Sequence, residues 1–157
     1  MSEASKSGGN FRWWWPAILM MAFIFVGSTD LGAASHQSRF LLPILQWLGF
    51  GEAAIRGIIF TIRKCAHLTE YALLAIFLWR AWMRRPAFRP PVTWSWRDTY
   101  PAFLFCAAFA ALDELHQAFV PSRSASGWDV MIDSVGAAIG ILLLWWWHGS
   151  QSAVSVK

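Results

Sequence analysis

Ten polar side chains interrupt otherwise apolar stretches of this sequence, and their chemical types suit the binding or the transformation of a charged ligand. They are Lys64, His67, Glu70, Tyr71, Asp113, Glu114, Gln117, Arg123, Asp129 and Asp133. Lysine binds phosphate as a point charge, and arginine does so through forked hydrogen bonds. A histidine among carboxylates can supply a base and an acid, because neighbouring carboxylates push their pKa values apart.

The spacing of these residues predicts that they form stripes on three helices, because residues three, four or seven apart share a helix face. The stripes are Lys64, His67 and Tyr71 with Glu70 beside them; Asp113 and Gln117 with Glu114 beside them; and Asp129, Asp133, Gly136 and Gly140. The last two residues form a GxxxG pattern, which permits close helix approach. We therefore expect the acids of the third stripe to face a helix bundle.

The elements that carry these stripes are predicted from composition. The chain has 157 residues, of which 57% are hydrophobic and 14% charged, whereas soluble domains carry roughly 25% charged residues. A spanning helix needs about 20 apolar residues. The sequence predicts an all-α, polytopic membrane protein whose four transmembrane helices cover about residues 13–27, 57–82, 99–120 and 128–147.

The remaining segments are predicted to flank this one membrane domain, residues 13–148. Residues 1–12 are expected to be a disordered cytoplasmic N-terminus, and residues 149–157 a short polar tail. An apolar stretch at residues 40–48 is too short to span and contains Pro43. We expect Pro43 to interrupt this stretch, which would form an interfacial or re-entrant segment in the first outer loop.

Basic and aromatic residues predict the orientation of the spans. The loop between the second and third spans holds four basic residues, Arg84, Arg85, Arg89 and Arg97, and excess Lys and Arg marks the cytoplasmic side. Tryptophans favour the membrane interface, and ten of them fall at the expected cytoplasmic one: Trp13, Trp14, Trp15, Trp79, Trp82, Trp94, Trp96, Trp145, Trp146 and Trp147. Both termini are therefore expected to be cytoplasmic, with all the polar stripes facing outward. The net charge of +4 is attributed to these loops and not to nucleic-acid binding.

A purely structural explanation of the charged residues competes with a functional one. Long side chains near helix ends reach back to water and pair with one another. Asp113 and Asp133 are too short to do so, and an ionised side chain at the bilayer centre costs ~2.5–3.5 kcal/mol on insertion scales. The two aspartates therefore favour a polar pocket that receives a ligand.

Two stretches resemble the VanZ-like family. One is Lys64-x-x-His67-x-x-Glu70-Tyr71, and the other is Glu114-x-x-Gln117-x-Phe119-x-Pro121-x-Arg123, continuing to Asp129, Asp133, Gly136 and Gly140. The family's pattern usually has Asn where this chain has Asp133. The resemblance covers roughly residues 13 to 148. It implies a bacterial inner-membrane protein, and through the family's namesake it suggests an effect on resistance to the glycopeptide-type antibiotic teicoplanin.

Two principal functions remain open at this stage. In the first, the chain is not an enzyme and binds membrane lipids or a lipid-linked cell-wall precursor, with Lys64 and Arg123 on the phosphate. In the second, it is an intramembrane enzyme on such a substrate, with catalytic candidates His67, Glu70, Asp113 and Glu114; the same groups could hold a divalent cation. No metal-binding signature such as HExxH is present, so no metal and no cofactor is expected. An ion pathway is a third option, disfavoured because the inner halves of the spans lack polar residues.

Overall fold

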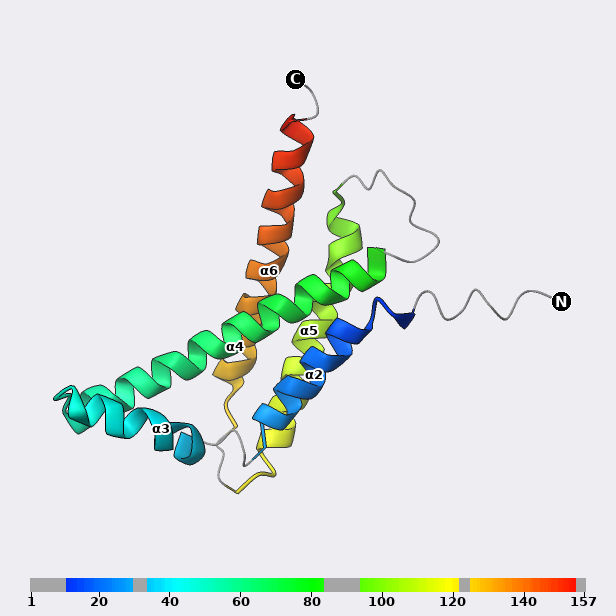
Figure 1. Ribbon diagram of the computed structural model, residues 1–157. Coiled ribbons are helices and arrows are strands. Elements are labelled where there is room, and N and C mark those ends of the chain that lie inside the picture. The colour runs from blue at the N-terminus through cyan, green and yellow to red at the C-terminus, as the bar shows by residue number, and fades with distance from the viewer. Residues whose placement is uncertain (1–10, 30–33, 84–93, 122–124, 155–157) are drawn as a thin grey trace.

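The computed structural model describes residues 11–29, 34–83, 94–121 and 125–154, and these are helical with short connections. Helix α2 spans Trp15–Gly27, α3 spans Ala34–Trp47 and α4 spans Glu52–Met83. Helix α5 spans Trp96–Gln117 and α6 spans Gly127–Val154 (Figure 1). No strand occurs in the described residues, so the predicted all-α class is confirmed.

The membrane-spanning character of these helices differs from one to the next. Within the described residues, one helical segment, Gly127–His148 of α6, is long and apolar enough to cross a membrane by length and composition. Helix α2 is apolar but has 13 residues, which is about 20 Å of helix against a hydrocarbon core of ~30 Å. Helices α4 and α5 have the length, but charged side chains lie along them.

Helices α4 and α6 form the closest packing in the fold, and two glycines make it possible. A Cβ atom on Gly136 would lie 2.5 Å from the backbone oxygen of Leu68, and one on Gly140 would lie 2.3 Å from that of Ala72. The helices run in the same direction along this seam, since Leu68 meets Gly136 and Ala72 meets Gly140. The close approach predicted from the GxxxG pattern is confirmed.

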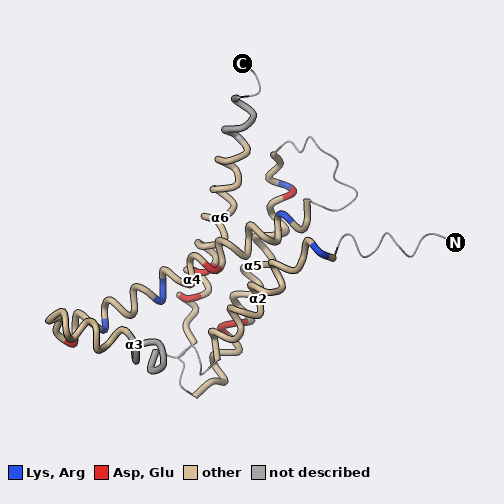
Figure 2. Tube along the Cα trace, in the orientation of Figure 1, with Lys and Arg blue, Asp and Glu red and all other residues tan. Residues whose placement is uncertain are grey.

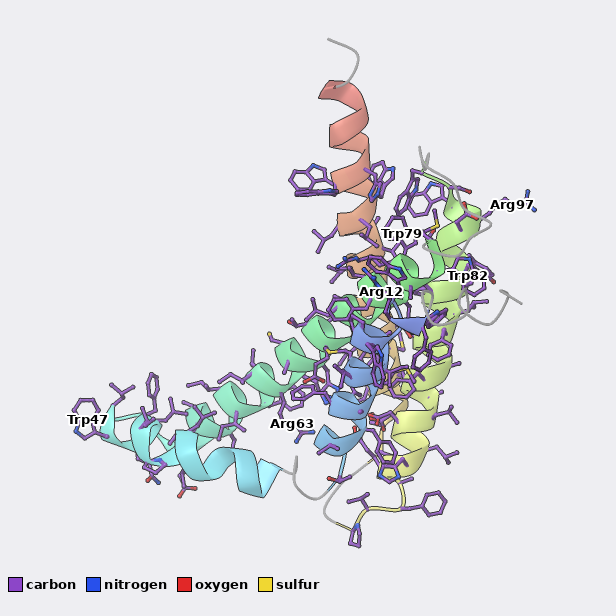
Figure 3. All side chains as sticks on the ribbon, turned by 45° about the vertical axis from the view of Figure 1, so that its right-hand side comes forward. Arg12, Trp47, Arg63, Trp79, Trp82 and Arg97 are labelled. Carbon is purple, nitrogen blue, oxygen red and sulfur yellow. The ribbon has the colours of Figure 1, made fainter. Side chains whose placement is uncertain are left out.

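The ends of four helices gather at one side of the molecule. The starts of α2 and α5 and the ends of α4 and α6 point toward the same end, while α3 and the first half of α4 project sideways as an arm (Figure 1). Trp47 stands at the outer tip of this arm (Figure 3) and is 85% exposed. Helix α3 packs against α4 along the arm.

The structure places Pro43 differently from the prediction and gives two helix bounds that differ from the predicted span bounds. Pro43 does not interrupt its stretch: it lies inside α3, because a proline removes one hydrogen bond of the helical ladder and the flanking bonds persist. Helix α4 begins at Glu52 and not near residue 57, with an acid in its first turn where the helix dipole favours negative charge. Helix α5 ends at Gln117, before Pro121, because the chain turns there, and the amide of Val120 bonds the carbonyl of Gln117 at 3.0 Å.

Several charged side chains are buried and many large apolar ones are exposed in the described part of the chain. Asp113, Glu114 and Asp133 are buried, whereas Leu19 and Phe23 are each 62% exposed. Large apolar side chains are also exposed along α5 and α6, among them Leu104, Phe105, Leu112, Leu115, Val135, Ile139, Leu142 and Leu143. Soluble monomers rarely expose such extended apolar surface.

Candidate functional site

The first part of the candidate site lies where α4 crosses α6, on the N-terminal side of Gly136 and Gly140. Lys64 of α4 forms an ion pair with Asp129 of α6, and both side chains are mostly buried. One turn further along, the Nδ1 atom of His67 lies 3.5 Å from Oδ1 of Asp133. The polar residues of α4 therefore pair with those of α6 in the same sequence order, Lys64 with Asp129 and then His67 with Asp133, because the two helices run parallel and close together.

The second part of the site joins α2 to α5. The Ser28 hydroxyl donates to Oδ2 of Asp113 at 2.6 Å, and the Gln117 amide donates to the same oxygen at 2.8 Å. The Gln117 amide also lies 3.3 Å from the Ser28 oxygen. All three residues are buried. Asp113 and Gln117 lie four apart on α5, so one helix turn presents both to the end of α2.

Glu114 connects α5 to the start of α6. Its Oε2 atom accepts a hydrogen bond of 2.7 Å from the backbone amide of Ser126. The Ser126 carbonyl in turn accepts from the amide of Asp129 at 2.8 Å. Glu114 therefore holds the first turn of α6 in the position from which Asp129 reaches Lys64.

Buried polar atoms without a hydrogen-bond partner among the described residues mark the centre of the site. They are the hydroxyl of Tyr71 and Oδ1 of Asp113; Nδ1 of His67 and Oδ1 of Asp133 make no hydrogen bond there either but lie 3.5 Å from each other. Tyr71 is completely buried. Buried polar groups in proteins are normally hydrogen-bonded, and leaving one unpaired costs roughly 1–3 kcal/mol. The atoms are therefore suited to a ligand or to water.

The charge of the described cluster is acidic. It contains five carboxylates, those of Glu70, Asp113, Glu114, Asp129 and Asp133, and one lysine, Lys64. Glu70 is half-buried and lies three residues after His67 on α4. Such a cluster attracts the hydrogen-bond donors of a ligand, such as hydroxyl or ammonium groups.

The structure thus brings together the side chains of α4, α5 and α6 that the sequence singled out. Arg123 lies outside the described residues, as does Asp30. That the assembled residues bind a ligand stays a prediction. In the described part of the chain, no group of three or more His, Cys, Asp and Glu side chains is arranged to hold a metal ion.

Three residues of this region were not among the ten expected from the sequence. Ser28 and Ser126 make hydrogen bonds to Asp113 and Glu114, and Arg63 has a buried Nε atom without a partner among the described residues. The signal for Ser28 was its position at the outer end of the first apolar run, at the depth of the three stripes, whereas only the packing shows which carboxylate it meets. Arg63 precedes Lys64 in the sequence, and its position within an apolar helix was the available signal.

Comparison with known proteins gave one family. The family model described as VanZ/LLP1 matches residues 13–148. No curated protein and no solved structure matches the chain.

Proposed function

The chain belongs to the VanZ/LLP1 family, and from that premise we propose that it is a multi-pass protein of the bacterial cytoplasmic membrane. Helices α2, α4, α5 and α6 would cross the bilayer, with both termini in the cytoplasm. Two features described above support this placement. Lipid would solvate the apolar outer surface, and the helix bundle would keep the buried acids away from lipid. The short helix α2 would require local thinning of the bilayer.

The arm formed by α3 and the first half of α4 would lie at the outer surface of the membrane. Its apolar side chains are exposed, among them Ile44, Trp47, Leu48, Phe50, Phe60 and Ile62. The exposed ion pair of Glu52 and Arg56 belongs to the same arm. A mixture of exposed aromatic and charged side chains suits the headgroup region, where Trp is enriched.

The proposed function is recognition of a lipid headgroup or a lipid-linked cell-envelope precursor at the outward-facing cluster. The observation that carries it is a pair of buried polar atoms, the hydroxyl of Tyr71 and Oδ1 of Asp113, which have no hydrogen-bond partner among the described residues. The oxygens of this pair would take hydroxyl or ammonium donors of the ligand. Lys64, together with Arg123, would take its phosphate. Sequestering a cell-wall precursor in this way would alter susceptibility to glycopeptides.

The binding proposal is tested on protein purified in native lipid discs. Lipids that co-purify are identified by mass spectrometry, and the binding of that lipid is then measured for variants. We expect Arg123→Ala and Asp113→Asn each to weaken binding about tenfold or more, since a hydrogen bond to a charged group contributes about 1.5–3 kcal/mol. Glu52→Gln on the exposed arm serves as the matched control and should bind as the wild type does. Equal binding by all variants contradicts the proposal.

An acid–base enzyme is the second candidate, and one contact favours it. The His67 imidazole lies 3.5 Å from the buried carboxylate of Asp133, an arrangement that orients a general base. Turnover of a purified lipid-linked precursor that disappears in His67→Ala, while binding persists, would establish this candidate. Binding without turnover in the wild type would exclude it for that precursor.

The orientation has a separate test. Ser124→Cys and Ser155→Cys are introduced one at a time in a chain lacking Cys65 and Cys106. We expect an impermeant thiol reagent to label position 124 in intact cells and position 155 only after lysis. The reverse pattern would move the cluster to the cytoplasmic side.

A further inference from the structure

A second site lies at the opposite end of the molecule from the acidic cluster. A cavity of about 150 Å³ opens between the start of α2 and the end of α4. Its lining residues are Arg12, Trp13, Pro16, Phe77 and Arg80. Figure 2 shows basic segments at the start of α2, the end of α4 and the start of α5, while most acidic segments of α4, α5 and α6 lie farther down.

The cavity carries positive charge that no carboxylate among the described residues neutralises. Arg12 and Arg80 come from different helices, both are exposed, and neither makes an ion pair with another described residue. Asp98, an acid in the first turn of α5, does not line the cavity. The start of α2 contributes the positive end of the helix dipole to the same place,. The cavity therefore favours an anion.

The shape and the walls indicate what kind of anion fits. Guanidinium groups bind phosphate oxygens through paired hydrogen bonds, and two of them facing one cavity can hold one phosphate between them. The volume is below the roughly 300–1,000 Å³ of pockets that enclose a whole small molecule. Trp13, Pro16 and Phe77 supply apolar walls beside the arginines. A phosphate attached to a glycerol and acyl chains matches this combination better than a free ion does.

We infer that Arg12 and Arg80 bind the phosphate of an anionic phospholipid in the cytoplasmic leaflet. Arg12 also lies against the ring of Trp13, 5.0 Å from its centroid, which fixes the guanidinium near the mouth of the cavity. Trp79, Trp82 and Arg97 lie toward the same end (Figure 3), and Trp residues favour headgroup depth. Basic pockets between helices on this side of a membrane suit anionic headgroups. The inference rests on the proposed membrane placement and not on ligand binding at the acidic cluster.

The test measures binding of phosphatidylglycerol and phosphatidylcholine to the full chain by native mass spectrometry from detergent. The variants are R12Q, R80Q, the double variant, and R97Q as the matched control. Arg97 begins the neighbouring helix α5, is exposed, does not line the cavity and points away from the helices (Figure 3). We expect phosphatidylglycerol to bind about 10- to 30-fold more weakly to the double variant. R97Q should match the wild type, and phosphatidylcholine should bind weakly throughout.

Three outcomes overturn the inference. One is unchanged phosphatidylglycerol binding in the double variant, and another is an equal loss in R97Q, which would indicate a general charge effect. The third is complete competition by inorganic phosphate at millimolar concentration, which would assign the cavity to a free anion. The variant D113N separates the two sites: it should retain phosphatidylglycerol binding even where it loses the ligand of the acidic cluster. The thiol-labelling pattern at position 124 reports the membrane placement independently.

Discussion

Replacing Gly140 with alanine tests the packing of α4 against α6, on which the acidic cluster depends. The added Cβ would lie 2.3 Å from the backbone oxygen of Ala72 and 2.9 Å from its Cα. Ordinary contacts of carbon lie near 3.5–4.0 Å, so the helices must separate locally by about 1 Å. The obstacle is backbone and not a flexible side chain, and no rotamer change can relieve it.

The magnitude follows from comparison with a matched glycine. Gly57 lies within α4, and a Cβ there meets nothing within 4 Å. Both substitutions gain helix propensity, about 1 kcal/mol per Gly→Ala change. The difference between them isolates the clash, which overpacking data place at about 1–3 kcal/mol. For a chain of this size that corresponds to a Tm lower in Gly140→Ala than in Gly57→Ala by roughly 2–12 °C.

Thermal unfolding can be followed through a thiol that the fold hides. Cys106 on α5 is fully buried, whereas Cys65 is exposed. In a Cys65→Ser background, a thiol-reactive fluorophore should react with Cys106 only as the chain unfolds in lipid discs. Gly57→Ala should melt at or above the temperature of the parent. Equal melting temperatures for Gly57→Ala and Gly140→Ala would refute the close packing of α4 and α6.

Two further predictions concern the contacts of the site. Ser28→Ala should lower stability by about 1–2 kcal/mol, because it removes one of the two donors to the buried Asp113 carboxylate,. Thr29→Val removes only an exposed local hydrogen bond to the Val26 carbonyl and should change the Tm little in the same thiol assay. A double-mutant cycle with Lys64→Met and Asp129→Asn should give a coupling energy of roughly 0.5–3 kcal/mol, because the pair is mostly buried,.

The control for that cycle is the ion pair of Arg56 and Glu52 on the arm. Its side chains are 72% and 84% exposed, and the two residues lie four apart on α4. Exposed pairs of this kind contribute about 0.3–0.5 kcal/mol. A coupling between Lys64 and Asp129 no larger than the control would show that the buried ion pair does not hold α4 and α6 together.

Local patterns were sufficient for the helical class and for most of the candidate site. Residues three and four apart define a helix face wherever the helix lies, so the stripes containing His67, Asp113 and Asp133 were visible without a structure. The GxxxG pattern of Gly136 and Gly140 likewise identified the packing face of α6, because only small side chains allow backbones to approach. Boundaries were less well predicted: Pro43 lies inside a helix, and α4 starts at Glu52.

The sequence by itself determined which side chains of each helix face the interior of the bundle. Helical periodicity and the cost of exposing a charge to lipid can both be judged from one helix at a time. Only the tertiary structure decided which groups meet: Lys64 with Asp129, Ser28 with Asp113, and Arg12 with Arg80 around one cavity. Such pairings join residues distant in the chain, and they depend on the register and direction in which helices pack. No spacing in the sequence encodes that register, because the packing of whole helix faces sets it.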